Sequence, residues 1–422
     1  MLKPSYIIAN KDEVIASLKK RNFNSEVLID ELISLDNDRK IVQTNYESKL
    51  SESNSISKTI GQLFKEGKKN ETVSLKEKSL KIKQETKSLS EKLNDIKVKI
   101  NNILFQIPNV PNKNVPVGNT SEDNLVIFES KTDINPQAKT PHWELAEKYD
   151  IIDFDMGNKI TGSGFPVYKG SGAKLQRALI SFFLDCNISF GYQEVQVPHL
   201  VNEESAFGTG QLPDKEGQMY SVPQDNLFLI PTAEVPITNI FRDEIIDELS
   251  LPILKTGYTP CFRREAGSYG SHVRGLNRLH QFDKVEIVRI DHPDNSYNSL
   301  ELMKDQIKSV IEKLELPFRI ITLCGGDLGF TSALTYDFEI YSPAQDKWLE
   351  VSSVSNFETF QSNRLKIRYR NAEGKTNLAH TLNGSSLALP RVLATIIENF
   401  QTDEGIKIPK ALHDYTGFTI IK

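Results

Sequence analysis

The chain has 422 residues, of which 38% are hydrophobic and 25% are charged, and its formal net charge is −5. Such a composition is typical of a globular protein of two or three domains in water, and no segment approaches the ~20 uninterrupted apolar residues that a membrane span requires. Lys11, Asp12 and Glu13 interrupt the N-terminal segment before a signal peptide could form, and the three cysteines form no CxxC pair, so we expect a cytoplasmic protein without zinc and without a membrane partner.

The charge is divided unevenly along the chain. Residues 1–110 contain 20 Lys and Arg against 15 Asp and Glu, a net of +5, whereas the remaining residues contain 31 against 41, a net of −10. This asymmetry indicates that the N-terminal part meets a polyanion, although a solvated helical surface accounts for it equally well.

The N-terminal quarter of the chain has the composition of long helices. Between Pro4 and Pro108 there is no proline, and the only glycines are Gly61 and Gly67. Apolar residues recur at steps of three, four and seven in two runs that the polar segment 66–72 separates. This pattern predicts an antiparallel two-helix coiled coil over about residues 28–104, within a helical arm at residues 1–107. The two runs are Leu28, Leu32, Leu35, Val42, Tyr46, Ile56, Ile60 and Leu63, and then Ile82, Leu89, Leu93, Ile96, Ile100 and Ile103.

Lysine is concentrated in the distal half of this predicted hairpin. Residues 49–99 contain 13 Lys against 7 acidic residues. A long basic arm with few aromatic side chains is better suited to binding the phosphate backbone of a nucleic acid than to recognising its bases. Phosphate is bound by charge, whereas bases are recognised by stacking and by contacts with their edges. A coiled coil that dimerises two chains is the alternative interpretation.

The composition changes after residue 107. Residues 107–118 contain three prolines, so we expect a linker at residues 108–120 and a second domain at residues 121–422. The second domain begins with an amphipathic helix at 173–186 and a strand-like segment that ends at Pro198. Its expected fold class is α+β, a mixed, mainly antiparallel sheet flanked by helices. Further strands are expected at 226–230, 284–290, 318–323, 336–342 and 365–370, with helical stretches around 233–249 and 296–314.

Residues 258–286 have the highest density of candidate functional side chains. Four arginines flank a small-residue loop at 266–271, and an aromatic and an acidic residue follow on a predicted strand. Guanidinium groups bind phosphate in a planar, bidentate manner and an aromatic ring stacks on a base, although a salt-bridged surface hairpin contains the same residue types. The GxxxxGK[ST] loop is absent, as is a GxGxxG turn that opens a βαβ unit. The residues concerned are Arg263, Arg264, Arg274, Arg278, Phe282 and Glu286.

The second domain contains four segments that together resemble the motifs of bacterial-type seryl-tRNA synthetases. They are PTAEVP at 231–236, CFRREAGSYG with RGLNRLHQFDKVE within 261–286, EVSSVSN at 350–356, and NGSSLALPRVLATIIENFQ at 383–401. The resemblance extends over essentially the whole chain, with the predicted hairpin similar to that family's tRNA-binding arm and the remainder similar to its class II catalytic domain. It implies a serine–tRNA ligase, which activates L-serine with ATP to seryl-adenylate and transfers serine to the 3′ end of tRNA(Ser), and also of tRNA(Sec) where the organism has one.

The resemblance implies an ATP site. Arg263 would bind the α-phosphate and stabilise the transition state, while Glu265 would accept a hydrogen bond from the adenine amino group and Phe282 would stack on the adenine ring. Arg391 would face the other side of adenine and the γ-phosphate, and Pro390 before it suits the first turn of a helix. The implied catalytic residues are Arg263, Glu350 and Arg391, and the implied ATP-binding residues are Arg263, Arg264, Glu265, Leu279, Phe282, Glu350, Val351, Ser352, Ser353 and Arg391.

The resemblance also implies a serine site. Glu286 would pair with the amino group of serine, and Thr232, Glu234 and Ser385, with Ala233, would surround its small side chain and hydroxyl. A buried site that hydrogen-bonds the hydroxyl should reject alanine strongly, because leaving polar groups unpaired costs several kcal/mol, roughly.

A metal ion and a second subunit are implied as well. Glu350 and Ser353 match the Mg²⁺ ligands of the family, and Mg²⁺ prefers hard oxygen ligands shared with substrate phosphates. The helix at 173–190 and the strand that ends at Pro198 resemble the motif that forms the dimer interface of class II synthetases, so we expect a homodimer.

Three other functions are compatible with parts of this pattern. A ligase that loads an amino acid onto a carrier protein would lack the long N-terminal arm, and the zinc-containing type of seryl enzyme would need a cysteine ligand that Cys261 and Cys324 do not supply. A non-catalytic tRNA-binding or scaffold paralogue would have lost the catalytic residues. Four residues depart from the family pattern: Arg264 replaces a small polar residue, Ser386 and Pro390 replace glycines, and Phe400 replaces a tyrosine.

Overall fold

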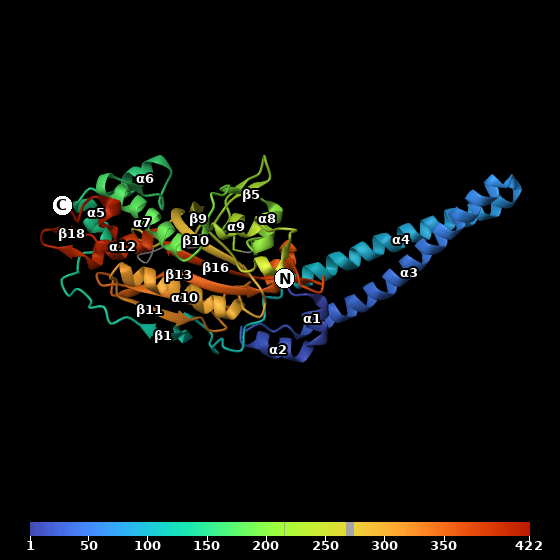
Figure 1. The fold of residues 1–422 in the computed structure, drawn as a ribbon, viewed down its shortest axis with the longest axis horizontal. Helices are drawn as coiled ribbons and strands as arrows, with labels where there is room; N and C mark the ends of the chain where they lie inside the picture. The colour runs from blue at the N-terminus through green and yellow to red at the C-terminus, as the bar shows by residue number, and fades with distance from the viewer. Residues whose placement is uncertain (215, 267–273) are drawn as a thin grey trace. The chain divides into compact units, whose positions relative to one another are not determined.

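The computed structural model describes residues 1–214, 216–266 and 274–422, and the chain divides into two compact units (Figure 1). The smaller unit contains Leu2–Lys19 and Phe23–Pro108, and the larger contains Met1, Lys20–Asn22 and Asn109–Lys422. Within the described ranges, none of the helices combines the length and the apolar character that crossing a bilayer demands.

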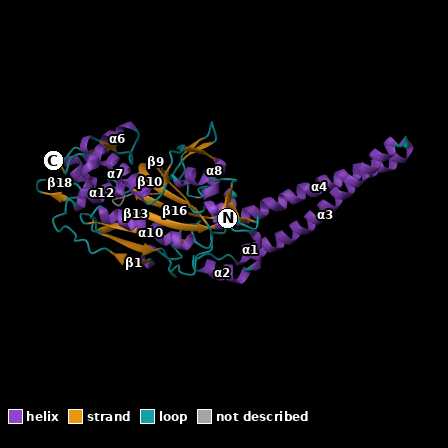
Figure 2. Cartoon of the chain, viewed as in Figure 1, coloured by secondary structure: helices purple, strands orange, loops and turns teal. Residues whose placement is uncertain are grey.

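The smaller unit is a helical hairpin preceded by two short helices. The helices α1 (Pro4–Ala9) and α2 (Lys11–Lys19) lead into α3 (Glu26–Lys65). After the short 3₁₀ helix η1 (Lys69–Glu71), α4 (Thr72–Leu104) returns along α3 (Figure 2). The predicted antiparallel hairpin is therefore confirmed, including the polar turn between its two helices.

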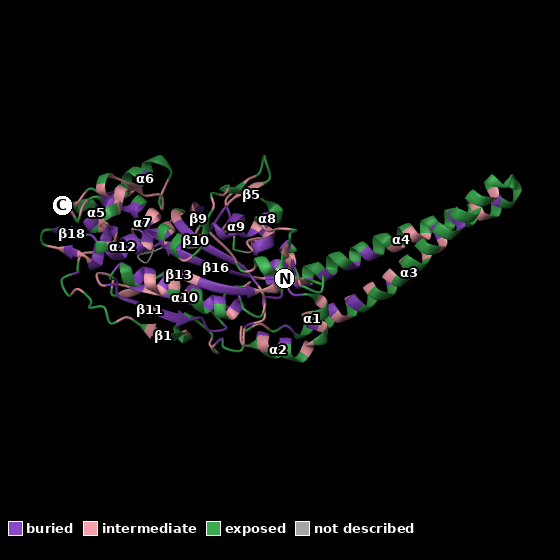
Figure 3. Cartoon of the chain, in the orientation of Figure 1, coloured by how far each residue is buried: buried purple, intermediate pink, exposed green. Residues whose placement is uncertain are grey.

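Buried side chains form a stripe along each long helix of the hairpin, while most other positions are exposed (Figure 3). The stripe has the three- and four-residue steps of a coiled-coil seam, so the heptad pattern in the sequence corresponds to the helix–helix contact. The buried apolar side chains are Ile29, Leu32, Val42 and Ile56 on α3, and Ile82, Leu93, Ile96, Ile100, Ile103 and Leu104 on α4.

Charged residues that interrupt the heptads are paired. Arg39 donates through Nε to Oδ1 of Asp36 at 2.8 Å, and Lys49 Nζ lies 2.7 Å from Oε2 of Glu85 on the opposite helix. Both pairs are partly exposed, so water screens them and their contribution to stability is small. Their effect is to let charged side chains occupy the seam without leaving a buried charge unpaired.

The larger unit is built on an eight-stranded sheet. Its strands are antiparallel except for the last pair, in which β4 runs parallel to β9. The mixed, mainly antiparallel sheet that the sequence predicts is therefore confirmed. In spatial order the strands are β1 (Leu125–Glu129), β11 (Phe318–Thr322), β12 (Leu334–Ser342), β13 (Lys347–Glu358), β16 (His380–Ala388), β10 (Gln281–Asp291), β9 (Ile253–Phe262) and β4 (Gln193–Glu194).

Three helices, α7 (Gly170–Ser189), α10 (Ser296–Lys313) and α12 (Leu389–Asn399), pack with this sheet in one large hydrophobic core. Val285 and Ile287 of β10 belong to that core. Because side chains alternate along a strand, Phe282, Lys284 and Glu286 project from the opposite face of β10. Lys284 and Glu286 thus lie across the sheet from that core, whereas Phe282 also packs against it.

Shorter elements surround the sheet. The helices are α5 (His142–Lys148), α6 (Phe154–Ile160), α8 (Glu203–Thr209), α9 (Glu234–Asn239), α11 (Thr359–Leu365) and α13 (His413–Thr416), with the 3₁₀ helices Ser121–Asp123, Glu248–Ser250 and Lys410–Leu412. The strands are β2 (Ile152–Asp153), β3 (Val167–Tyr168), β5 (Leu200–Asn202), β6 (Ser221–Val222), β7 (Leu227–Leu229), β8 (Ile245–Asp247), β14 (Arg368–Arg370), β15 (Thr376–Leu378), β17 (Gln401–Thr402), β18 (Gly405–Lys407) and β19 (Ile420–Ile421).

Three expected elements differ in the structure. The helical stretch expected around 233–249 was wrong beyond α9, because β8 follows and pairs with β14. The strand expected to end at Pro198 is only the two-residue β4, and the one expected at 365–370 begins at Arg368. In each case tertiary pairing, which a local pattern does not contain, decides where the element ends.

The proline-rich segment that follows the hairpin packs within the larger unit. The side chain of Asn109 is buried and donates to the carbonyl oxygens of Thr331 and Phe357, both at 2.9 Å. The backbone N–H of Asn112 donates to the carbonyl of Ala333, and Val115 lies in the main core. These contacts hold residues 109–115 against the sheet.

Candidate active site

Two adjoining cavities lie over the face of the sheet from which Lys284 and Glu286 project. The arginine cavity, of about 230 Å³, is bounded by Arg263 and Arg391, and the carboxylate cavity, of about 400 Å³, is bounded by Glu234 and Glu286. Five side chains line both cavities, so a ligand in one would contact a ligand in the other. They are Arg263, Glu265, Lys284, Ser353 and Ser385.

The strand β10 supplies the floor of both cavities through alternate side chains. Phe282 lines the arginine cavity, Glu286 lines the carboxylate cavity, and Lys284 between them lines both. In the neighbouring strand β16, Ser385 is paired in register with Glu286 and lies beside it. Three of the five side chains that line both cavities, Lys284, Ser353 and Ser385, therefore come from strands of the sheet, which hold side chains more precisely than loops do.

Arg263 follows β9 and lies against the aromatic floor of the arginine cavity. Its guanidinium carbon is 5.2 Å from the centroid of the Phe282 ring, and its Nε donates to the carbonyl of Pro231 at 3.4 Å. This cation–π contact and the hydrogen bond to Pro231 position the guanidinium group over the floor of the cavity. Such a group can hold an anionic oxygen between the two cavities.

Arg391 occupies the far wall of the arginine cavity, in the first turn of α12. Its Nη1 donates to the carbonyl of Glu350 at 2.6 Å and lies 3.7 Å from the Glu350 carboxylate, and its Nε donates to the carbonyl of Asn277 at 3.2 Å. Pro390 stands before it at the start of the helix, where the missing N–H costs nothing. The cavity thus carries a guanidinium group at each side, as polyphosphate binding requires.

Glu286 is the central acid of the carboxylate cavity and is only 1% exposed. Oε2 accepts from the Thr232 hydroxyl at 3.0 Å and lies 2.9 Å from Lys284 Nζ, and Oε1 accepts from Asn383 Nδ2 at 3.3 Å. Burial raises the pKa of Glu286, and the ion pair with Lys284 is the largest opposing influence. The carboxylate is therefore oriented by three donors and faces a cavity of amino-acid size.

Glu234 lines the same cavity. Burial, and then the charge of Glu286, raise the pKa of Glu234 to about 7. Gln361 donates to Glu234 Oε1 at 2.6 Å, and Gln361 in turn accepts from the Thr381 hydroxyl at 2.7 Å. Two carboxyl groups close together can hold one ammonium group between them, and a partly protonated Glu234 can also donate to a hydroxyl.

Most of the residues that the resemblance implies are brought together in this cleft, but two are not. Arg264 is exposed and lines neither cavity, and its backbone N–H donates to the carbonyl of Gln218 at 2.9 Å. Ala233 is fully buried and packs with Ile237 of α9 rather than lining the cavity. The implied residues in the cleft are Thr232, Glu234, Arg263, Glu265, Leu279, Phe282, Glu286, Glu350, Val351, Ser352, Ser353, Ser385 and Arg391.

Sequence reasoning missed three residues that contact the buried acids. Lys284 and Asn383 contact Glu286, and Gln361 contacts Glu234. Only Lys284 had a signal in the sequence, because it stands two positions from Glu286 on a predicted strand and must share its face. Asn383 and Gln361 come from other elements and have no such pattern.

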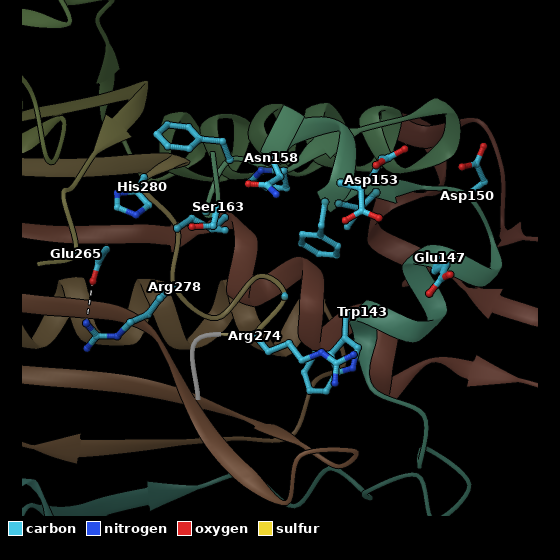
Figure 4. Close-up of a pocket in the computed structure, with 18 residues that line it drawn as sticks. Trp143, Glu147, Asp150, Asp153, Asn158, Ser163, Glu265, Arg274, Arg278 and His280 are labelled. Atoms are coloured by element: carbon cyan, nitrogen blue, oxygen red, sulfur yellow. Dashed lines mark hydrogen bonds and ion pairs between the residues drawn. The ribbon is translucent and has the colours of Figure 1, made fainter. Parts of the chain in front are cut away.

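A further cavity of about 730 Å³ adjoins the arginine cavity (Figure 4). Glu265 and Arg278, 2.8 Å apart, line both of these cavities, and on its far side Arg274 stacks on the Trp143 ring at 5.0 Å. The loop at 266–271, which the sequence places between Arg264 and Arg274, lies outside the described residues after Ala266.

The fold and the site define a class of protein. A mainly antiparallel sheet with paired arginines over one cavity and two buried acids over an adjoining cavity is the arrangement of a class II aminoacyl-tRNA synthetase, and residues 220–400 match the family described as "tRNA synthetase class II core domain (G, H, P, S and T)". Residues 1–111 match the "Seryl-tRNA synthetase N-terminal domain".

Similar proteins identify the particular family. The chain is 49% identical over 411 residues to the serine–tRNA ligase of Salinibacter ruber, with 96% of this chain and 95% of that protein covered. The crystal structure of seryl-tRNA synthetase from Pyrococcus horikoshii complexed with ATP is similar with a TM-score of 0.90 and 33% identity, over 100% of this chain and 99% of that one. M. kandleri seryl-tRNA synthetase, solved with A. aeolicus tRNASec, shares the fold with a TM-score of 0.59 and 17% identity, over 77% of this chain and 68% of that one. The chain belongs to the serine–tRNA ligase family and is a class II aminoacyl-tRNA synthetase that joins serine to tRNA.

Proposed function

We propose that the carboxylate cavity binds L-serine and the arginine cavity binds ATP, so that the serine carboxylate meets the α-phosphate at the boundary where Arg263 lies. The observation that carries this proposal is the shared wall, because a cationic side chain that lines both cavities can contact both reactants. Glu286, with Thr232 beside it, pairs with the serine amino group, and Ser385 hydrogen-bonds the serine hydroxyl. Glu234 completes the polar surroundings of the amino acid.

Arg263 has the decisive role in the proposed chemistry. A serine carboxylate oxygen attacks the α-phosphorus, the bond to the leaving pyrophosphate breaks, and seryl-adenylate remains. The carboxylate and the phosphate are both anions, so a fixed cation between them lowers the barrier by reducing their repulsion and stabilising the transition-state charge. The stacking of the guanidinium on Phe282 at 5.2 Å supplies that fixed position.

The other side chains of the arginine cavity position ATP in this proposal. Phe282 stacks on the adenine and Glu265 accepts from its amino group, while Arg391 faces the other side of the adenine and the γ-phosphate. Leu279, Val351 and Ser352 shape the cavity, with the Ser352 hydroxyl engaged by the carbonyl of Ser385 at 2.6 Å.

Glu350 and Ser353 are the proposed ligands of Mg²⁺, and the residues present fit the ion. Mg²⁺ is commonly held by one or two carboxylates together with substrate phosphates, and no group of three or more acidic, histidine or cysteine ligands occurs in the described parts of the chain. Buried Asp337 pairs in register with Ser353, and its Oδ1 has no hydrogen-bond partner among the described residues. Burial and then the charge of Glu350 raise the pKa of Asp337. When bound, Mg²⁺ would withdraw charge from the phosphate oxygens.

The helical arm is the proposed binding element for tRNA(Ser). We assign residues 1–107 to this arm, 108–120 to a linker and 121–422 to the catalytic domain. A long basic surface recognises RNA through shape and phosphates, a mode that does not depend on the anticodon, so the same arm can accept tRNA(Sec). Its exposed lysines, such as Lys69, Lys81 and Lys83, supply the charge.

Two further features belong to the proposal. The chain forms a homodimer through α7 and the segment that ends at Pro198, as the resemblance of these residues to motif 1 implies, and it acts in the cytoplasm. Light scattering coupled to gel filtration tests the dimer, and a mass of one chain, 47.7 kDa, would contradict it.

The activity test is serine-dependent exchange of pyrophosphate into ATP without tRNA, with threonine and alanine as controls. Exchange with serine alone supports the two-cavity proposal, and a folded, magnesium-replete protein that exchanges with no amino acid contradicts it and favours a non-catalytic paralogue. For the arm, a variant with Lys69, Lys81 and Lys83 changed to glutamate should keep exchange and lose tRNA charging. Unchanged charging by this variant and by a deletion of residues 28–104 would rule the arm out as the tRNA-binding element.

A further inference from the structure

His142 is a fully buried histidine that lies outside the arginine and carboxylate cavities and is the first residue of α5. Its Nδ1 lies 2.7 Å from Glu398 Oε1, and its Nε2 accepts from the backbone N–H of Leu276 at 2.9 Å. A backbone N–H can only donate, so Nε2 is the acceptor and the ring proton resides on Nδ1, facing the carboxylate. The imidazole is therefore held in one tautomer between two elements that are distant in sequence.

Glu398 anchors the imidazole from α12. Its Oε1 also accepts from the His142 backbone N–H and from Gln345 Nε2, both at 3.0 Å, and its Oε2 accepts from the Ser342 hydroxyl. Burial by itself would raise the pKa of Glu398, but the contacts with His142 and Ser342 outweigh it and lower that pKa. The carboxylate is thus a fixed anion with a full set of donors.

The segment that His142 holds lines the arginine cavity. Leu276 and Asn277 precede Arg278 and Leu279, and all four line it. The chain packs closely on the imidazole here, because a Cβ added to Gly275 would lie 2.2 Å from His142 Nε2, and Gly275 has a φ of +69°. No residue other than glycine fits this approach without a shift.

The same segment also holds Arg391. The carbonyl of Asn277 accepts from Arg391 Nε at 3.2 Å, and Asn277 Nδ2 donates to Gln345 Oε1 at 2.8 Å. Arg391 and Glu398 are seven residues apart on α12 and so lie on one side of that helix, two turns apart. The helix α12 therefore contacts the 276–279 segment at two places. Arg391 bonds to Asn277 directly, and Glu398 is linked to Leu276 through His142.

We propose that His142 is a positioning residue for ATP, which fixes the Leu276–Asn277 backbone and, through the Asn277 carbonyl, the guanidinium of Arg391. The proposal rests on the assignment of the arginine cavity to ATP. His142 makes no contact in the carboxylate cavity, so its loss should weaken ATP binding and leave serine binding unchanged. A displacement of about 1 Å in a positioning group can cost up to 10²-fold in rate.

A matched pair of variants separates the two hydrogen bonds of His142. In H142N the amide nitrogen can replace Nδ1 and donate to Glu398, but the side chain is too short to accept from Leu276. In H142Q the amide oxygen can reach the place of Nε2 and accept from Leu276, while the bond to Glu398 is lost. Pyrophosphate exchange with ATP or serine varied in turn gives both KM values, and thermal unfolding gives the stability of each variant.

We expect H142N to raise the KM for ATP roughly tenfold and to leave the KM for serine unchanged, with H142Q close to wild type for both. A purely structural role would rank the variants the other way, because H142Q leaves the buried carboxylate of Glu398 short of a donor and is the less stable of the two. A normal KM for ATP in H142N, or equal losses for ATP and serine, would overturn the proposal. If H142N does not fold, G275A tests the same contact from its other side and should show the same selective loss for ATP. Absence of exchange in the wild type would instead refute the ATP assignment itself.

Discussion

Replacing Lys284 with methionine should make the KM for serine depend on pH. Lys284 Nζ lies 2.9 Å from Glu286 Oε2, and the two side chains are 9% and 1% exposed. Burial raises the pKa of Glu286, and Lys284 is the largest influence that lowers it again. Methionine is similar in length but uncharged, so Glu286 in the variant should take up a proton at a higher pH than in the wild type.

The magnitude follows from proton linkage. Serine is bound as an ammonium ion that needs Glu286 as a carboxylate, so serine binding to the variant releases a proton. Each pH unit below the pKa of Glu286 then costs about 1.4 kcal/mol, which is roughly tenfold in KM. The total cannot exceed the cost of leaving one member of a buried ion pair without its partner, about 3–5 kcal/mol.

The stability of the same variant should depend on pH in the opposite sense. A carboxyl group whose pKa is higher in the folded than in the unfolded state takes up a proton on folding, so the folded state loses stability as pH rises through the folded pKa. Relative to wild type, K284M should therefore be less stable at about pH 8 than at about pH 6, yet bind serine better at the higher pH. A variant that is merely misfolded would lose both together.

The assay is pyrophosphate exchange with serine varied across this pH range, accompanied by thermal unfolding at each pH. K284R keeps the charge and serves as the control, so its KM profile should follow the wild type. The ratio of KM between K284M and wild type should rise as the pH falls, by up to roughly tenfold for each unit. A ratio that does not change with pH would refute the role assigned to Lys284.

Three other results are expected from the proposed cleft. Arg263→Lys should lower the kcat of exchange roughly 10²–10³-fold, because lysine keeps the charge without the planar fork that stacks on Phe282, and a near-normal kcat would contradict the transition-state role. Ser385→Ala should reduce the preference for serine over alanine, measured as the ratio of kcat/KM, by roughly tenfold, the value of one hydrogen bond of about 1.5 kcal/mol, and an unchanged ratio would place the hydroxyl elsewhere. Chelation by EDTA should stop exchange and added Mg²⁺ should restore it, so exchange that persists in EDTA would argue against the ligand pair of Glu350 and Ser353.

Features that depend on local pattern could be predicted from the sequence. The heptad runs and the polar turn at 66–72 predict α3 and α4, because each helix buries one stripe and the stripe repeats along the chain. The alternation on β10 similarly implies that Phe282 and Glu286 share a face. The motifs around Arg263, Glu350 and Arg391 indicate the class of enzyme before any contact is known.

Contacts between distant residues were decided only by the tertiary structure. Gln361 meets Glu234 across 127 positions, and His142 meets Glu398 across 256. Neither pair has a local pattern, since any buried glutamine or histidine could satisfy its hydrogen bonds in many ways, and the partner is chosen by which elements the sheet brings together. The ends of α9 and β4 were misjudged for a related reason, because strand pairing overrides local preference.

The sequence therefore determines which chemical groups the site contains, whereas the fold determines the pKa values and the orientations of those groups. Glu286 and Glu234 are ordinary acids in the chain, and their pKa values are raised because the sheet and α9 remove them from water, while Lys284 and Gln361, brought to their oxygens by the fold, oppose that rise. Desolvation and hydrogen bonding depend on position in space, and for these residues position in space is set by elements far away in the chain.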